Sequence, residues 1–335
     1  MAIAFFDLEG PLSPQDNAYE VMGLFENGHK VFEVVSKYDD ILTLEGRENY
    51  EPGDTLKLIV PFLLYHGITE EDIKRVSQKA KIIAGTKEAI SELKRQGFRV
   101  FVISTSYQQH AFNIAEQIGI EKRNVACTRL ELSKIYEKLK EEDLSIVKKA
   151  EEKILEDYPK VDVKFLDSFF FKELQKTKVG EIFREVTIVG GSRKVKAMLS
   201  FIEKENVSMS NVVAIGDSIT DFKMLNKVRE EKGLAIAFNG NEYCIPYASI
   251  GIATIDQRFT LPVLKAFKDG GKEKAIELVK ELEDDEEKIK SMAIKTEILP
   301  KYHCIEGASK EKIDSIIKVH KKYRTLVRGE AGKLG

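Results

Sequence analysis

The sequence predicts an α/β protein with a parallel sheet. From Gly85 onward, short apolar runs alternate with amphipathic helical segments, which is the pattern of strands joined by helices. The runs at residues 3–6, 99–104 and 212–215 are almost continuously apolar. Continuous apolar runs of this length are typical of parallel strands that are buried on both faces. Each of these runs ends in polar residues, so the carboxyl edge of the predicted sheet is the first place to look for a site.

A helical segment interrupts the chain after the first strand. From Asn17 to about Ile83 the apolar residues recur at helical spacing. A segment of this length is too long for an ordinary loop, so we interpret residues 14–84 as a small inserted helical domain. The core domain then consists of residues 1–13 and 85–256.

The remaining core elements alternate as the fold class requires. The strands predicted after the first lie at residues 99–104, 125–130, 186–189, 212–215, 234–238 and 249–253, with helices at 86–96, 111–119 and 193–205. Two segments exceed this alternation: a helical insertion at 132–178 and a charged, helical C-terminal extension at 257–335. The aromatic run Phe169-Phe170-Phe171 is expected to pack the insertion against the core.

The composition argues against several classes of protein. The 53 Lys+Arg residues nearly balance the 55 Asp+Glu residues, so charge indicates neither a nucleic-acid partner nor an anionic membrane surface. Cys127, Cys244 and Cys304 have no paired spacing, which predicts no disulfide framework and suits a reducing compartment. No apolar stretch reaches the length of a bilayer span, and the N-terminus lacks a signal-peptide pattern. We therefore expect a cytoplasmic protein.

Two carboxylates follow the first strand. Side chains alternate along a strand, so Asp7 and Glu9 can point to the same side near its carboxyl end. Two carboxylates held together repel each other, and a divalent cation is the simplest remedy. The alternative is a strand that ends by chance in an acidic loop.

Three further segments place polar groups at comparable positions. Ser104 and Thr105 end a strand, where hydroxyl and backbone N–H groups can bind a phosphate. Lys194 begins a helix, and Asp217 and Asp221 close another strand, where they can share a metal. Alone, these are ordinary as a turn, a surface lysine or a helix cap. Together they predict the groups that phosphoryl transfer needs.

The four segments resemble the motifs of the haloacid dehalogenase (HAD) superfamily, in particular its phosphoserine phosphatase branch: Asp7-Leu8-Glu9-Gly10, Ser104, Lys194 and Gly216-Asp217-Ser218-Ile219-Thr220-Asp221. The resemblance implies a Rossmann-like core whose helical cap domain is inserted after the first motif, which matches residues 14–84. It also implies a phosphatase that hydrolyses a small phosphate ester through an aspartyl-phosphate intermediate, with Mg²⁺ as the cofactor.

The resemblance implies a role for each matching acid. Asp7 would be the nucleophile and Glu9 the general acid and base. The Mg²⁺ site would include Asp7, the main-chain carbonyl of Glu9, Asp217 and the neighbouring Asp221. Covalent catalysis by a carboxylate divides one difficult step into two easier ones.

The resemblance also implies which residues bind the phosphoryl group and which bind the rest of the substrate. Ser104, with Thr105 beside it, would hold the phosphoryl oxygens, and Lys194 would balance their charge. Asp16 occupies the place of a substrate-binding glutamate. No arginine matches the one that binds the substrate carboxylate, and Arg47 and Lys57 are the nearest candidates. A further departure is Glu9 itself, since an aspartate is usual at that position.

The insertion and the extension leave other functions open. This longer form resembles archaeal HAD proteins that are grouped with energy-converting hydrogenases. One alternative is therefore an accessory subunit that binds a protein partner through the insertion or the extension. The other is a phosphotransferase that passes the phosphoryl group to an alcohol. We interpret the basic run at residues 318–328 as a solvated helix face.

Overall fold

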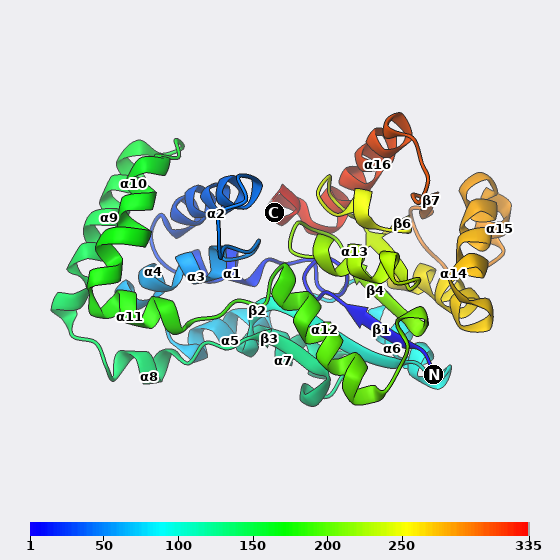
Figure 1. Ribbon diagram of the computed structural model, residues 1–335, viewed down its shortest axis with the longest axis horizontal. Coiled ribbons are helices and arrows are strands. Elements are labelled where there is room, and N and C mark those ends of the chain that lie inside the picture. Colours follow the sequence, from blue (N-terminus) through cyan, green and yellow to red (C-terminus); the bar gives the residue numbers. More distant parts are fainter. Residues whose placement is uncertain (334–335) are drawn as a thin grey trace.

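A mostly parallel sheet forms the centre of the molecule (Figure 1). The computed structural model describes residues 1–333. Within them, seven strands are ordered β3-β2-β1-β4-β5-β6-β7, and all neighbours are parallel except β6 and β7. The strands are β1 (Ile3–Phe6), β2 (Arg99–Tyr107), β3 (Val125–Thr128), β4 (Val212–Gly216), β5 (Leu234–Phe238), β6 (Ile250–Ala253) and β7 (Lys301–Cys304). The predicted α/β fold with a Rossmann-like parallel sheet is confirmed.

Strand β1 lies between the two strands whose ends matter most. Phe6 pairs with Val102 of β2 and with Ile215 of β4. The backbone N–H of Asp7 donates to the carbonyl of Ile215 (2.9 Å), so the ladder continues one residue beyond the strand. Because the three strands are parallel and in register, their carboxyl ends meet at one edge of the sheet.

Helices cover both faces of the sheet. The even-numbered residues of β1 pack under α6, α7 and α14, and its odd-numbered residues pack under α12, α13 and α16. This alternation follows from the two-residue period of a strand. The bounds are α6 (Thr86–Arg95), α7 (Gln108–Gln117), α14 (Leu261–Asp284), α12 (Ser192–Glu205), α13 (Phe222–Glu230) and α16 (Lys310–Arg328).

The cap and the insertion share one hydrophobic core, which lies at the end of the molecule away from β5, β6 and β7 (Figure 1). The cap helices are α1 (Asn17–Met22), α2 (Gly28–Leu44), α3 (Thr55–Leu58), α4 (Val60–Tyr65) and α5 (Glu70–Gln78). The helices of the insertion and the segment after it are α8 (Leu132–Tyr136), α9 (Ser145–Asp157), α10 (Val163–Ser168) and α11 (Lys178–Glu185). The ring of Phe170 lies 6.1 Å from that of Tyr38 and 6.4 Å from that of Phe62. The aromatic run thus packs the insertion against the cap, and the prediction that it packs against the core is wrong.

The sequence predicted a helical C-terminal extension, but the extension is not wholly helical. Besides α14, α15 (Glu286–Lys290) and α16, it contains β7, which pairs Lys301 with Ala253 and Cys304 with Ile250. The predicted strand at residues 186–189 is also wrong. That segment runs beside the end of β3, where the N–H of Val189 donates to Oγ1 of Thr128 (3.1 Å) without forming a ladder. None of the described helices is long and apolar enough to cross a bilayer.

Candidate active site at the strand ends

Asp7 and Asp217 meet across a loop that only glycine permits. Asp7 follows β1, Asp217 follows β4, and their residues are 5% and 1% exposed. Gly10 has a φ of 104°, and a Cβ at this position would lie 2.2 Å from Oδ2 of Asp217. A larger residue would therefore push the loop away from the carboxylate. The spacing between Asp7 and Gly10 therefore brings the loop after β1 against the carboxylate of Asp217.

A buried lysine joins the acids of the two strand ends. Nζ of Lys194, at the start of α12, lies 2.8 Å from Oδ1 of Asp7 and 2.7 Å from Oδ1 of Asp221. Oδ2 of Asp221 accepts the backbone N–H groups of Asp217 (3.0 Å) and Ser218 (3.2 Å). Asp221 therefore fixes both the lysine and the loop after β4. Lys194 is fully buried, and its two carboxylate partners raise its pKa despite the opposing effect of burial, so it remains charged.

The acids at this edge fit a divalent cation. Carboxylate oxygens of Asp7, Asp217 and Asp221 lie within 4.8 Å of one another. Oδ1 of Asp217 is buried and accepts no hydrogen bond from the described residues. An unpaired buried carboxylate oxygen is costly, and Mg²⁺ prefers such oxygen ligands. The arrangement therefore suits a magnesium ion.

Glu9 faces the same cavity from the loop after β1. Its Oε1 accepts the backbone N–H of Asn17 (2.9 Å), at the start of the cap, and lies 3.5 Å from Nε2 of His110. Burial and, to a lesser extent, the nearby Asp16 carboxylate raise the pKa of Glu9 to about 8. A carboxyl group that is protonated at neutral pH can donate a proton to a leaving group.

Ser104 and Thr105 line the cavity from within β2. Oγ of Ser104 accepts the N–H of Ser106 (3.1 Å), where the register between β2 and β3 shifts. Oγ1 of Thr105 is buried and has no hydrogen-bond partner in the described residues. This hydroxyl can therefore donate to an anion in the cavity.

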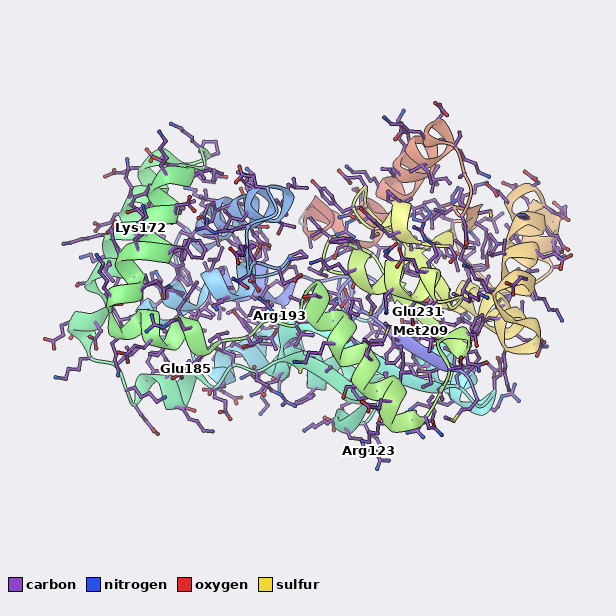
Figure 2. All side chains as sticks on the ribbon, in the orientation of Figure 1. Arg123, Lys172, Glu185, Arg193, Met209 and Glu231 are labelled. Atoms are coloured by element: carbon purple, nitrogen blue, oxygen red, sulfur yellow. The ribbon has the colours of Figure 1, made fainter. Side chains whose placement is uncertain are left out.

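A loop of the cap closes onto the core next to these residues. Gly53 has a φ of 92°, and a Cβ there would lie 2.8 Å from Cγ2 of Thr105. Beside it, Glu51 accepts the N–H of Ser192 (2.9 Å), and Asp54 forms an ion pair with Arg193. Figure 2 shows Arg193 at the junction between the cap helices and α12. The cap is thus closed over the strand ends.

The far side of the cavity is acidic. Asp16 contributes from the N-terminus of α1, where its Oδ1 accepts the N–H of Tyr19 (2.9 Å). Asp39 and Asp40 contribute from α2. Oδ2 of Asp39 accepts from Oγ1 of Thr55 (2.7 Å), and burial raises the pKa of Asp39 to about 7.

Two residues predicted to bind substrate do not line this cavity. The guanidinium of Arg47 pairs with Asp167 and lies 3.8 Å from the centre of the Phe171 ring. Nζ of Lys57 lies 4.9 Å from the centre of the Phe183 ring. Both residues join the cap to the segments around α10 and α11. The structure therefore places neither residue in the cavity, and their role in substrate binding stays a prediction.

Two arginines that the sequence analysis missed do line it. Arg324 and Arg328 extend from α16, and both contact Oδ2 of Asp217. Their side chains are 2% and 6% exposed, so the prediction that the whole run 318–328 is solvated is wrong. The available signal was their spacing of four residues on the helical face that also carries Tyr323 and the buried His320.

Comparison with known proteins identifies the family. The family model of haloacid dehalogenase-like hydrolases matches residues 3–229. The chain therefore belongs to the haloacid dehalogenase-like hydrolases. Within that family it resembles the phosphoserine phosphatases, as the motifs suggested. A phosphoserine phosphatase of Archaeoglobus fulgidus is 24% identical over 181 residues, which are 53% of this chain but 38% of that protein.

Solved structures agree on the fold. A gene product of Archaeoglobus fulgidus shares 29% identity, with a TM-score of 0.82 over 100% of this chain and 99% of the other. This likeness extends over the insertion and the C-terminal extension. A phospho-aspartyl intermediate analogue of phosphoserine phosphatase shares 20% identity, with a TM-score of 0.52 over 78% of this chain and 97% of the other. This second likeness shows the common fold.

Proposed function

We propose that this protein is a Mg²⁺-dependent phosphatase of small phosphate esters that acts through an aspartyl-phosphate at Asp7. The observation that carries the proposal is that Asp7 lies 2.8 Å from Lys194 and has a carboxylate oxygen within 4.8 Å of one of Asp217, whose Oδ1 is unpaired among the described residues, in the cavity that Thr105 also lines. A nucleophile, a balancing cation, a metal-binding oxygen and a free hydroxyl donor then meet at one point.

The first half of the reaction transfers the phosphoryl group to the protein. A carboxylate oxygen of Asp7 attacks phosphorus, and the bond from phosphorus to the ester oxygen breaks. Glu9, whose raised pKa of about 8 keeps it protonated at neutral pH, donates its proton to the departing oxygen. Lys194 and the hydroxyl of Thr105 stabilise the negative charge on the phosphoryl oxygens.

The second half releases phosphate. Glu9, now a carboxylate, takes a proton from water, whose oxygen attacks phosphorus and breaks the bond to Asp7. Asp7, Asp217 and the main-chain carbonyl of Glu9 would hold Mg²⁺, with Asp221 beside them. When bound, the ion supplies positive charge that offsets the charge of the phosphoryl group. The closed cap excludes bulk water from these steps.

The acidic far side suggests which esters fit. Asp16, Asp39 and Asp40 face the space beyond the phosphoryl position. We expect esters whose organic part is neutral or cationic to be preferred over esters that carry an additional carboxylate, because like charges repel.

A screen of phosphorylated metabolites tests the proposal. Phosphate release is measured with Mg²⁺ and with a chelator, and each reaction is repeated with an acceptor alcohol. Hydrolysis that requires Mg²⁺ and disappears in Asp7→Asn supports the proposal. Transfer to the alcohol in preference to water would favour a phosphotransferase, and no turnover of any ester would favour an accessory subunit.

A further inference from the structure

The helix α16 brings its last turns to the acids of the strand ends. Figure 1 shows the C-terminal segment between α2 of the cap and the strands of the core. Nη1 of Arg324 contacts both the main-chain oxygen (3.1 Å) and Oδ2 of Asp217, while its Nε donates to the carbonyl of Gly332 (2.9 Å). The guanidinium is thereby held from both sides.

Arg328 reaches the same carboxylate oxygen from the next turn. Its Nη1 donates to Oδ2 of Asp217 (2.9 Å), and its Nε donates to the carbonyl of Pro14 (3.2 Å) in the loop that leads into α1. Both arginines therefore bind Oδ2, and Oδ1 of Asp217 accepts no hydrogen bond from the described residues. Arg328 also lines the cavity with Asp7 and Glu9.

Cations and carboxylates balance within this network of direct contacts. Lys194 pairs with Asp7 and Asp221, and the two arginines pair with Asp217. Three positive groups thus match three negative groups. A divalent cation alone would add two positive charges to a balanced, buried network, and a phosphate dianion alone would add two negative charges. The two together restore the balance, and such charges interact strongly where water is excluded.

We propose that Arg324 and Arg328 couple the binding of the divalent cation to the binding of the phosphate ester, so that each binds weakly alone and tightly with the other. The positive charges of the arginines repel a cation at Asp217, and the negative charge of the phosphate offsets this repulsion. This inference rests on the proposed function in taking Asp217 as a cation ligand. It concerns binding affinity, whereas the proposed function concerns turnover.

Binding of Mn²⁺, followed by electron paramagnetic resonance on the full chain, tests the coupling directly. Mn²⁺ is titrated alone and with saturating inorganic phosphate. In the wild-type protein we expect phosphate to tighten Mn²⁺ binding by roughly 5- to 150-fold, the usual range of coupling between sites. An equal Kd with and without phosphate would overturn the inference. Absence of Mn²⁺ binding under both conditions would overturn the cation site of the proposed function as well.

Variants of α16 separate competition from simple support of Asp217. Arg328→Gln should bind Mn²⁺ alone more tightly than wild type and should lose most of the phosphate effect. Arg328→Lys keeps the charge and should keep the coupling. Lys321→Gln is the matched control, because it removes one charge from the same helix at a side chain that is 54% exposed and pairs with Glu242.

Two results for these variants would contradict the inference. Weaker Mn²⁺ binding by Arg328→Gln would mean that the arginine supports the metal ligand and does not compete with the ion. Indistinguishable titrations for Arg328→Gln and Lys321→Gln would mean that only overall charge matters. Circular dichroism confirms that each variant is folded before it is titrated, and the wild-type titration remains a test if one is not.

Discussion

The two sides of the cavity are built in different ways. On the core side, Asp7 and Asp217 follow directly after β1 and β4, Ser104 lies within β2, and the parallel register of these three strands brings the residues together. On the cap side, Asp39 and Thr55 depend on the packing of helices that also bury the insertion. Under the proposed function, the core side would serve the step that all phosphate esters share, and we expect the cap side to decide which ester enters.

The largest effect should come from the core side. Asp7→Asn removes the nucleophile but keeps an oxygen for the metal, so we expect kcat to fall by about 10⁴-fold or more. The fold and Mn²⁺ binding should persist. The measurement is steady-state phosphate release, with circular dichroism as the control for folding. Activity near the wild-type level would rule out covalent catalysis by Asp7.

Glu9→Gln should produce the next largest effect, and one that depends on the leaving group. An alkyl phosphate, whose leaving oxygen needs a proton, should react roughly 10²–10⁴-fold more slowly. p-Nitrophenyl phosphate needs no proton in the first step, so a burst of p-nitrophenol should precede slow turnover. Equal slowing of both substrates without a burst would assign Glu9 to the loop or the metal.

Asp39 on the cap side should affect stability and its dependence on pH. Burial raises the pKa of Asp39 to about 7 from an ordinary value of 3.8. The folded protein therefore holds this proton more tightly than the unfolded chain. The resulting stabilisation is complete below about pH 4 and is lost as the pH rises through 7.

The variant Asp39→Asn lacks this titration and should gain, relative to wild type, roughly 2–4 kcal/mol of unfolding free energy between pH 4 and pH 8. Urea unfolding at both pH values measures the difference. The amide oxygen can still accept from Thr55 and from the N–H of Gly53. Parallel curves for the two proteins would show that Asp39 is already ionised when folded.

Asp16 lies where the two sides meet, so its effect should be intermediate and confined to binding. Asn is as good a helix N-cap as Asp, and Asp16→Asn should therefore leave stability nearly unchanged. Loss of a charged hydrogen-bond acceptor should raise KM about tenfold for a cationic or hydroxylated ester. kcat should change much less, as for the loss of uniform binding. Equal effects on kcat and kcat/KM would place Asp16 in the chemical step.

The smallest kinetic effect is expected at Arg47. Its partners Asp167 and Phe171 lie outside the cavity, so Arg47→Ala should leave KM within about twofold of wild type. It should lower the unfolding free energy by about 1 kcal/mol, because an ion pair and a cation–π contact are lost. Lys57→Ala should behave similarly. A large rise in KM for either variant would return these residues to the substrate side.

The two sides also differ in how far the sequence could predict them. Three site residues could be located because each lies at the end of an apolar run that by itself predicts a strand. They are Asp7, Ser104 and Asp217. Lys194 could be located because it begins the helix before β4. Their meeting point then followed from one rule, that the carboxyl ends of parallel strands share an edge.

The features that the sequence analysis did not predict correctly share a different physical origin. Arg47 and Lys57 were plausible on charge alone, but the insertion and the segment after it, which contact them, lie more than 100 residues later. Strand β7 was missed because a short edge strand with alternating burial resembles the charged helices around it. The run at 186–189 has strand-like residues but meets β3 only where that strand ends. Tertiary packing decided each of these cases.

The contact between Asp217 and α16 also has a consequence for synthesis of the chain. Arg324 follows Asp217 by 107 positions and Arg328 follows it by 111. A ribosome that adds about 5–20 residues per second needs roughly 5–20 s to cover that distance. During this interval Asp217 has already been synthesised, whereas Arg324 and Arg328 have not. A nascent chain would thus present the carboxylate of Asp217 before the two arginines that pair with it exist, whereas Lys194, the partner of Asp7 and Asp221, has already been added.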